Sequence, residues 1–279
     1  MLRTALVLVL VGDVGACACA QVFPEEREGL ETLLGQIETS LTTQTPPLWS
    51  LFSPLGSLAI AGKGDGSYTV VRRDNLRHNP DASAAFALPA GTAATFRVFE
   101  SARELTTGRA ILEGPGNEHW LAAFTALPDG PGGAYRLTAL CIFPADQLLP
   151  AEAARDAVMV VKEWERVVRE GQMTDLRRYL YPEPFLSIMG KGGMELFLYV
   201  DPEHYLTMAR YAIEVGRPEI SEMSEIHAVT NGTITVVTGK WKAPNVVFGL
   251  GDYRFTAFLV KSAEAWKVAG MFMGTQTQY

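Results

Sequence analysis

The sequence predicts an α+β protein made of two tandem copies of one domain, each a long helix followed by an antiparallel sheet. Three observations support this fold class. The 279-residue length suits two domains. A seven-residue pattern recurs about half a chain apart, and each copy lies between a helical stripe and a run of β-like segments. With 48% hydrophobic and 20% charged residues, each half can bury a core of its own.

The repeated pattern reads L-x-I-x-G-K-G and begins at Leu58 and again at Leu186. An amphipathic helix is expected before each copy, because apolar residues recur there at i, i+3, i+4, i+7 and i+11. In the first half these are Leu30, Leu33, Leu34, Ile37 and Leu41, and in the second Ala157, Val160, Val161, Trp164 and Val168. The same elements in the same order indicate a duplication.

The β-like segments that follow each copy also correspond. In the second half, the segment 219–238 contains Asn231-Gly232, a strong signal for a two-residue hairpin turn. That turn would pair His227 with Val236 and Glu225 with Thr238. In the first half, segments 97–104 and 109–112 take this place. Later strands are expected at 121–127 and 135–142, and at 255–261 and 266–273.

Prolines mark the junction between the two halves near residues 144–153. We therefore expect a first domain over 21–146 and a second over 151–279. The halves differ in the middle. Asp201 followed by Pro202 predicts the start of a helix that ends at Gly216, whereas 72–91 of the first half indicates a shorter or irregular segment.

The first twenty residues are typical of a signal peptide. Arg3 precedes a short apolar stretch, and Ala18-Cys19-Ala20 fits the small-x-small rule for cleavage. We therefore expect residues 1–20 to direct export, which makes the protein secreted or periplasmic. The alternative is a lipoprotein signal, with a lipid anchor at Cys17. No apolar run reaches the ~20 residues of a transmembrane helix. Cleavage would leave Cys141 alone in an apolar segment, where we expect a buried and inert thiol.

Composition and motifs exclude several classes of function. The net charge of −7, with no basic run, argues against nucleic-acid binding. The four histidines have no zinc-ligand spacing. Glycine follows the lysine of both G-K-G segments, where a P-loop has Ser or Thr, so a tight turn between strands is expected there. We expect no metal and no cofactor.

The order of elements resembles the nuclear-transport-factor-like superfamily, also described as SnoaL-like or cystatin-like, best over residues 152–274. The resemblance implies cone-shaped domains, each with a curved sheet around a long helix and a pocket that often holds a small apolar ligand. Members include isomerases, dehydratases and hydrolases as well as proteins that only bind, so the fold does not decide the function. The duplication suits a monomer whose two domains associate as an intramolecular pseudo-dimer, much as single-domain relatives form homodimers.

Two pairs in the second half are candidate catalytic residues. Glu225 and His227 lie two apart on a strand and share a face with Met223 and Val229, and a carboxylate beside an imidazole suits a general base. The alternative places both on the outer, solvated face. Asp201 and His204 are the second pair, although Asp201 is most simply a helix cap.

Four aromatic residues of the second half are candidates for ligand binding, because each has an apolar body and a polar atom. They are Tyr199, Tyr205, Trp241 and Tyr253. The alternative is that they belong to an ordinary core.

The leading hypothesis is an exported tandem protein that binds a small apolar ligand or a protein partner without catalysis. The alternative is a cofactor-free acid–base enzyme, an isomerase, dehydratase or hydrolase that uses the second-domain pocket. A third hypothesis is an interaction protein at the cell surface or in the periplasm, whose partner is unknown.

Overall fold

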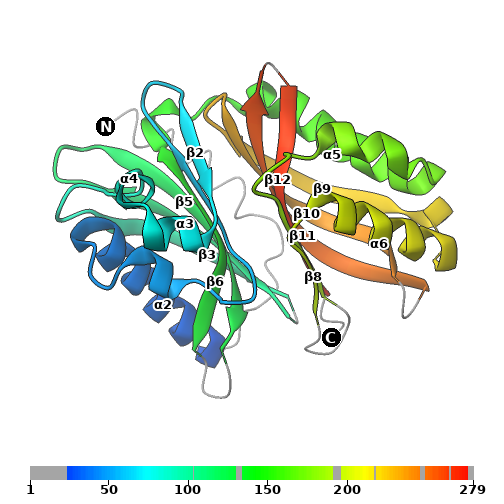
Figure 1. Cartoon of the computed structure of the whole chain (residues 1–279). Helices are drawn as coiled ribbons and strands as arrows, with labels where there is room; N and C mark the ends of the chain where they lie inside the picture. Colours follow the sequence, from blue (N-terminus) through cyan, green and yellow to red (C-terminus); the bar gives the residue numbers. More distant parts are fainter. Residues whose placement is uncertain are drawn as a thin grey trace. The chain divides into compact units, whose positions relative to one another are not determined.

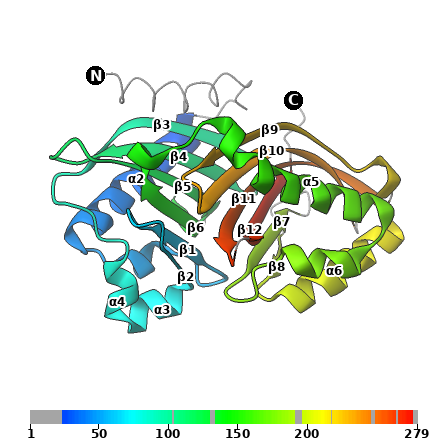
Figure 2. The same cartoon turned by 90° about the horizontal axis from the view of Figure 1, so that it is seen from above.

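The computed structural model describes residues 24–102, 104–129, 134–190, 196–216, 218–245, 249–263 and 265–275. The expected signal peptide and Cys17 lie outside these residues. The chain forms two compact units (Figures 1 and 2). The first holds the described residues up to Ser101 together with Thr106–Leu148, and the second holds Ala102–Leu105 and the described residues from Leu149 onward.

Each unit contains one six-stranded sheet, and the two sheets have the same topology. The strand order is β2-β1-β6-β5-β4-β3 in the first unit and β8-β7-β12-β11-β10-β9 in the second. The α+β class is confirmed, but each sheet is mixed rather than antiparallel. The first strand of each unit pairs with the last, and these pairs, β1–β6 and β7–β12, are parallel.

The first unit begins with α2, a helix that covers one face of the sheet (Figure 1). The five apolar residues of its predicted stripe are at most 2% exposed, which confirms that part of the prediction. Its elements are α2 (Pro24–Thr43), η1 (Leu48–Leu51), β1 (Leu58–Gly62), β2 (Tyr68–Val71), α3 (Arg73–His78), α4 (Pro80–Ala84), β3 (Ala93–Ser101), β4 (Thr106–Glu113), β5 (His119–Pro128), β6 (Tyr135–Pro144) and η2 (Ala145–Gln147).

In the second unit, α5 and α6 pack on one face of the sheet (Figure 1). Its elements are η3 (Ala151–Ala154), α5 (Arg155–Glu170), η4 (Met173–Tyr179), β7 (Leu186–Gly190), β8 (Leu196–Tyr199), α6 (Pro202–Val215), η5 (Pro218–Ile220), β9 (Glu222–Thr230), β10 (Ile234–Asn245), β11 (Gly249–Ser262) and β12 (Ala265–Thr275). Helix α6 has its predicted bounds, with Asp201 before its first residue and Gly216 after its last.

The two units fill the space between helix and sheet with different side chains. The core of the first unit consists mainly of Leu, Ile, Ala and Phe. Among its buried residues that the structure describes, only Tyr135 has a polar atom at the tip of its side chain. The core of the second unit contains three tryptophans, three tyrosines and several methionines. Cys141 of β6 is fully buried, as predicted, and burial raises the pKa of its thiol. The thiol therefore stays protonated and unreactive.

A short segment that precedes the junction also packs in the second unit. The carboxylate of Glu104, 2% exposed, accepts hydrogen bonds from the backbone N–H and the hydroxyl of Thr275, at 2.8 and 2.9 Å. Thr275 ends β12, so this carboxylate completes the hydrogen bonding at the end of the strand. The second unit thus includes the described residues of Ala102–Leu105, which belong to the first half of the sequence.

None of the helices in the described residues has the length and apolar character that a membrane crossing requires.

Packing at Gly108 should make the first unit sensitive to a single methyl group. A Cβ at Gly108 would lie 2.2 Å from a ring atom of the fully buried Phe124, whereas a Cβ at Gly35, on the exposed side of α2, would meet nothing within 4 Å. We expect Gly108→Ala to lower the free energy of unfolding by about 2 kcal/mol. The control Gly35→Ala should raise it by about 0.5–1 kcal/mol. Urea unfolding followed by circular dichroism measures both, and equal effects would contradict this packing.

Candidate functional site

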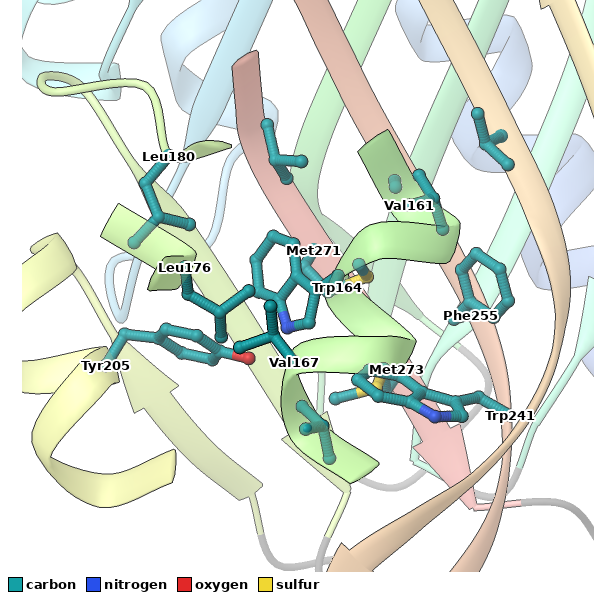
Figure 3. Close-up of a cluster of buried hydrophobic side chains, with 14 of the residues drawn as sticks. Val161, Trp164, Val167, Leu176, Leu180, Tyr205, Trp241, Phe255, Met271 and Met273 are labelled. Carbon is teal, nitrogen blue, oxygen red and sulfur yellow. The ribbon is translucent and has the colours of Figure 1, made fainter. Parts of the chain in front are cut away.

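The interior of the second unit contains a network of aromatic rings in edge-to-face contact (Figure 3). Tyr205 of α6 lies at its centre. Its ring centroid is 5.4 Å from that of Trp164 on α5, 5.6 Å from Phe185 and 5.5 Å from Tyr199 on β8. Such contacts contribute ~0.5–1.5 kcal/mol per pair beyond burial. The network therefore holds both helices against the sheet.

Two polar groups meet inside this network. Figure 3 shows the indole nitrogen of Trp164 and the hydroxyl of Tyr205 near one another. Burial raises the pKa of Tyr205, and the nearby Trp164 N–H offsets only part of that rise. Within the described part of the chain, no hydrogen bond of normal geometry satisfies the Trp164 N–H, which is fully buried. Leaving such a donor unsatisfied costs ~1–3 kcal/mol.

Further polar atoms lie nearby on the sheet. Burial, with a smaller contribution from Tyr253, raises the pKa of Tyr199 to about 12, so its phenol is neutral at physiological pH. Ser187 is fully buried on β7, and its hydroxyl has no partner among the described residues. It lies between Phe185 and Met189, which both pack in the aromatic core, so strand alternation points it inward.

The four predicted ligand-binding residues belong to this one core. Tyr199, Tyr205, Trp241 and Tyr253 are all buried within it. Trp241 differs from Trp164 because its indole N–H donates a hydrogen bond of 2.9 Å to the hydroxyl of Ser221. The structure thus brings the predicted residues together, and their role in binding stays a prediction.

The turn changes the pairing predicted for His227, and the turn and a β-bulge together change the one predicted for Glu225. Thr230 pairs with Thr235 across a four-residue turn, so His227 lies opposite Thr238 and not Val236. The predicted pairings were therefore wrong by two residues. The partner of Glu225 was wrong as well, because the bulge places Glu225 and Ile226 together opposite Gly239.

The bulge also decides which side chains of β9 face the core. Met223, Ile226 and Ala228 pack there, so His227 and Val229 take the opposite face. Met223 and Val229 therefore lie on opposite faces of the strand, and the prediction that they share one face was wrong. The Glu225 carboxylate accepts a hydrogen bond of 2.6 Å from Lys240, whose neighbour Trp241 points inward.

The second candidate pair lies at the start of α6. The carboxylate of Asp201 accepts a hydrogen bond of 2.7 Å from the backbone N–H of His204, which is a helix cap. His204 is exposed, and its ring contacts Tyr199 edge-to-face at 5.3 Å. The four candidate catalytic residues therefore do not meet in one place.

The surface of the second unit has two polar hollows beside β9. One, of about 620 Å³, is open to solvent and lies between α5 and the start of β9. Glu165 in its wall pairs with Lys162 at 3.2 Å and with Arg169 at 3.4 Å. The other, of about 270 Å³, is lined in part by Glu225, Lys240 and Asp252. Both walls are dominated by charges that pair with one another, which suits water better than an apolar ligand.

The part of the chain that the structure describes contains no group of three or more His, Cys, Asp or Glu side chains able to hold a metal ion.

Sequence reasoning placed Trp164 on the buried stripe of its helix but did not select it as a site residue, and it missed Ser187. A comparison of corresponding positions in the two halves of the sequence could have identified both residues. Trp164 corresponds to Ile37, and Ser187 to Ala59, so each is a polar-tipped residue where the first half has an aliphatic one.

No protein-family model matches the sequence, and no curated protein is similar to it. Solved structures resemble about half of this chain each. A protein of the DUF3225 family from Pectobacterium atrosepticum is 14% identical over 47% of this chain and 97% of its own, with a TM-score of 0.37. An NTF2-like protein of unknown function from Pseudomonas putida is 11% identical over 47% and 91%, with 0.39. A protein with a cystatin-like fold from Caulobacter vibrioides is 8% identical over 45% and 91%, with 0.39.

The backbone of Glu225 should be strained, because its φ of 49° is a left-handed conformation that costs residues other than glycine ~1–2 kcal/mol. We compare Glu225→Gly with Glu225→Gln, since both remove the partly exposed ion pair with Lys240. The glycine variant should be more stable than the glutamine variant by about 1 kcal/mol in urea unfolding. A glycine variant that is the less stable of the two would contradict the bulge.

Proposed function

We propose that the second unit binds a small, largely apolar molecule that carries an oxygen acceptor, and that it does so without catalysis. One observation supports this most directly: the Trp164 N–H is fully buried in an aromatic interior, and among the described residues its one nearby acceptor, the Tyr205 hydroxyl, does not meet it in a hydrogen bond of normal geometry. A ligand carbonyl or ether oxygen would satisfy that donor, while the surrounding rings would cover the rest of the ligand.

The interior of the second unit also suits a ligand through its adaptability. Met271 and Met273 of β12 lie in the same core (Figure 3). Methionine is unbranched and repacks at low cost, so space for a ligand can open without disrupting the sheet. The first unit has no comparable combination, since aliphatic residues and phenylalanines dominate its core.

The same geometry favours binding over acid–base catalysis. Asp201 is occupied as a helix cap, and Glu225 is paired with Lys240. The raised pKa values of Tyr199 and Tyr205 keep both phenols protonated at neutral pH, where they act as hydrogen-bond donors rather than bases. None of the four candidate catalytic residues thus supplies a base inside the aromatic core.

Export remains part of this proposal. The expected signal peptide, residues 1–20, leads us to propose that the protein acts outside the cytoplasm, and N-terminal analysis of the protein from its own host tests this. A start at Gln21 supports a cleaved signal, and a lipid-modified Cys17 supports an anchor. A protein that retains Met1 inside the cell would contradict export. Association of the two domains within one chain also stays a prediction.

Binding through the Trp164 N–H should depend on a ligand oxygen. The probes are 1-tetralone, an apolar bicycle with a carbonyl, and tetralin, the same bicycle without it. We expect the protein to bind 1-tetralone about tenfold more tightly, because only the ketone accepts the hydrogen bond. Trp164→Phe should abolish this preference while retaining an aromatic ring. Isothermal titration calorimetry measures both affinities.

The matched control is Trp241→Phe, which shortens a ring of the same core whose N–H already has Ser221 as acceptor. This variant should keep the preference for the ketone, with circular dichroism confirming that both variants fold. An equal loss in both variants, or equal binding of ketone and hydrocarbon by the unmodified protein, would overturn the proposed role of Trp164.

A further inference from the structure

The first unit carries two arginine side chains on a single indole ring. Trp49, in η1, is half-buried. The guanidinium carbon of Arg73 lies 5.6 Å from the centroid of its ring, and that of Arg77 lies 5.1 Å away. The two arginines are four residues apart on α3, so they occupy the same face of the helix. Both are within the range of a cation–π interaction.

Hydrogen bonds fix one of these arginines but leave both charges uncompensated. The Nε of Arg73 donates to the backbone carbonyl of Trp49 at 3.2 Å, and its backbone N–H donates to Ser57 Oγ at 2.8 Å. Among the residues that the structure describes, no carboxylate forms an ion pair with Arg73 or Arg77. Like charges four residues apart on a helix repel each other, so this arrangement is costly without an anion.

In the corresponding elements of the second unit, an arginine is neutralised by a carboxylate. There η4 and α6 take the positions of η1 and α3, and Arg177 of η4 pairs with Glu203 of α6 at 2.9 Å. In the first unit, another arginine beside Trp49 is neutralised in the same way. Arg136 donates to Ser50 O and to the Asp129 carboxylate, both at 2.7 Å. Of these four arginines, Arg136 and Arg177 pair with a carboxylate, whereas Arg73 and Arg77 have no carboxylate partner among the described residues.

We propose that Arg73, Arg77 and Trp49 form a binding site for an oxyanion group, a phosphate or a carboxylate of a small ligand. The indole ring lies within cation–π distance of both guanidinium groups, and the carbonyl of Trp49 accepts a hydrogen bond from the Nε of Arg73. The remaining N–H groups are paired donors, and their spacing matches two oxygen atoms of a carboxylate or of a phosphate. The chain is acidic overall, so this cluster attracts an anion through its local geometry and not through net charge.

The test follows the side chains directly by nuclear magnetic resonance. The Nε–H signals of the arginines and the indole N–H of Trp49 are recorded as inorganic phosphate is added at constant ionic strength, and again with acetate. We expect saturable shifts at Arg73, Arg77 and Trp49. Arg77→Gln should weaken the affinity about tenfold, the loss expected for a hydrogen bond between charged groups.

The matched control is Arg27→Gln, which removes an arginine of α2 that is 66% exposed and lies 3.6 Å from the Glu31 carboxylate. Its affinity should equal that of the unmodified protein. Saturation by phosphate alone assigns a phosphate ligand, and saturation by acetate alone assigns a carboxylate. Unsaturated shifts that sodium chloride reproduces, or an equal loss in Arg27→Gln, would overturn the proposal.

Discussion

Each unit depends on one constraint: a six-stranded sheet presents a broad face that a single long helix must help to bury. Hydrogen bonding satisfies the strands, but the face itself gains stability only when apolar side chains exclude water from it. In the first unit α2 supplies Leu and Ile for this purpose, and in the second α5 supplies Val and Trp164. The two units therefore share one topology, but different side chains pack between the helix and the sheet in each.

The tryptophans and tyrosines in the core of the second unit bring polar atoms into the interior, where aliphatic side chains would bring none. Indole and phenol rings cover large areas, but each also carries an N–H or O–H that needs a partner when buried. The Trp241 N–H donates to the Ser221 hydroxyl, whereas the Trp164 N–H, among the described residues, has only the Tyr205 hydroxyl nearby and forms no hydrogen bond of normal geometry. A core under selection for stability alone would gain from an aliphatic residue at that position. This difference between two tryptophans of one core is the physical basis of the proposed ligand site.

Much of the fold was predictable because it depends on periodic burial. The stripe of α2, the bounds of α6 from Asp201 to Gly216 and the burial of Cys141 all follow from local patterns. The bulge at Glu225 was not predictable, because glutamate is not the residue that signals a left-handed conformation. The contact between the arginines of α3 and Trp49 was not predictable either, because nothing local to residues 72–78 indicates that Trp49 packs against them. Both features arise from partners that are remote in the sequence.

The central claim is that the aromatic interior of the second unit holds a small molecule. Native mass spectrometry of the protein, purified gently from its own host, tests this most directly. We expect a single chain that carries a defined additional mass, which is released on denaturation and proves to be a largely apolar molecule with an oxygen acceptor. A chain that repeatedly carries no additional mass, under conditions that preserve its fold, would contradict the claim.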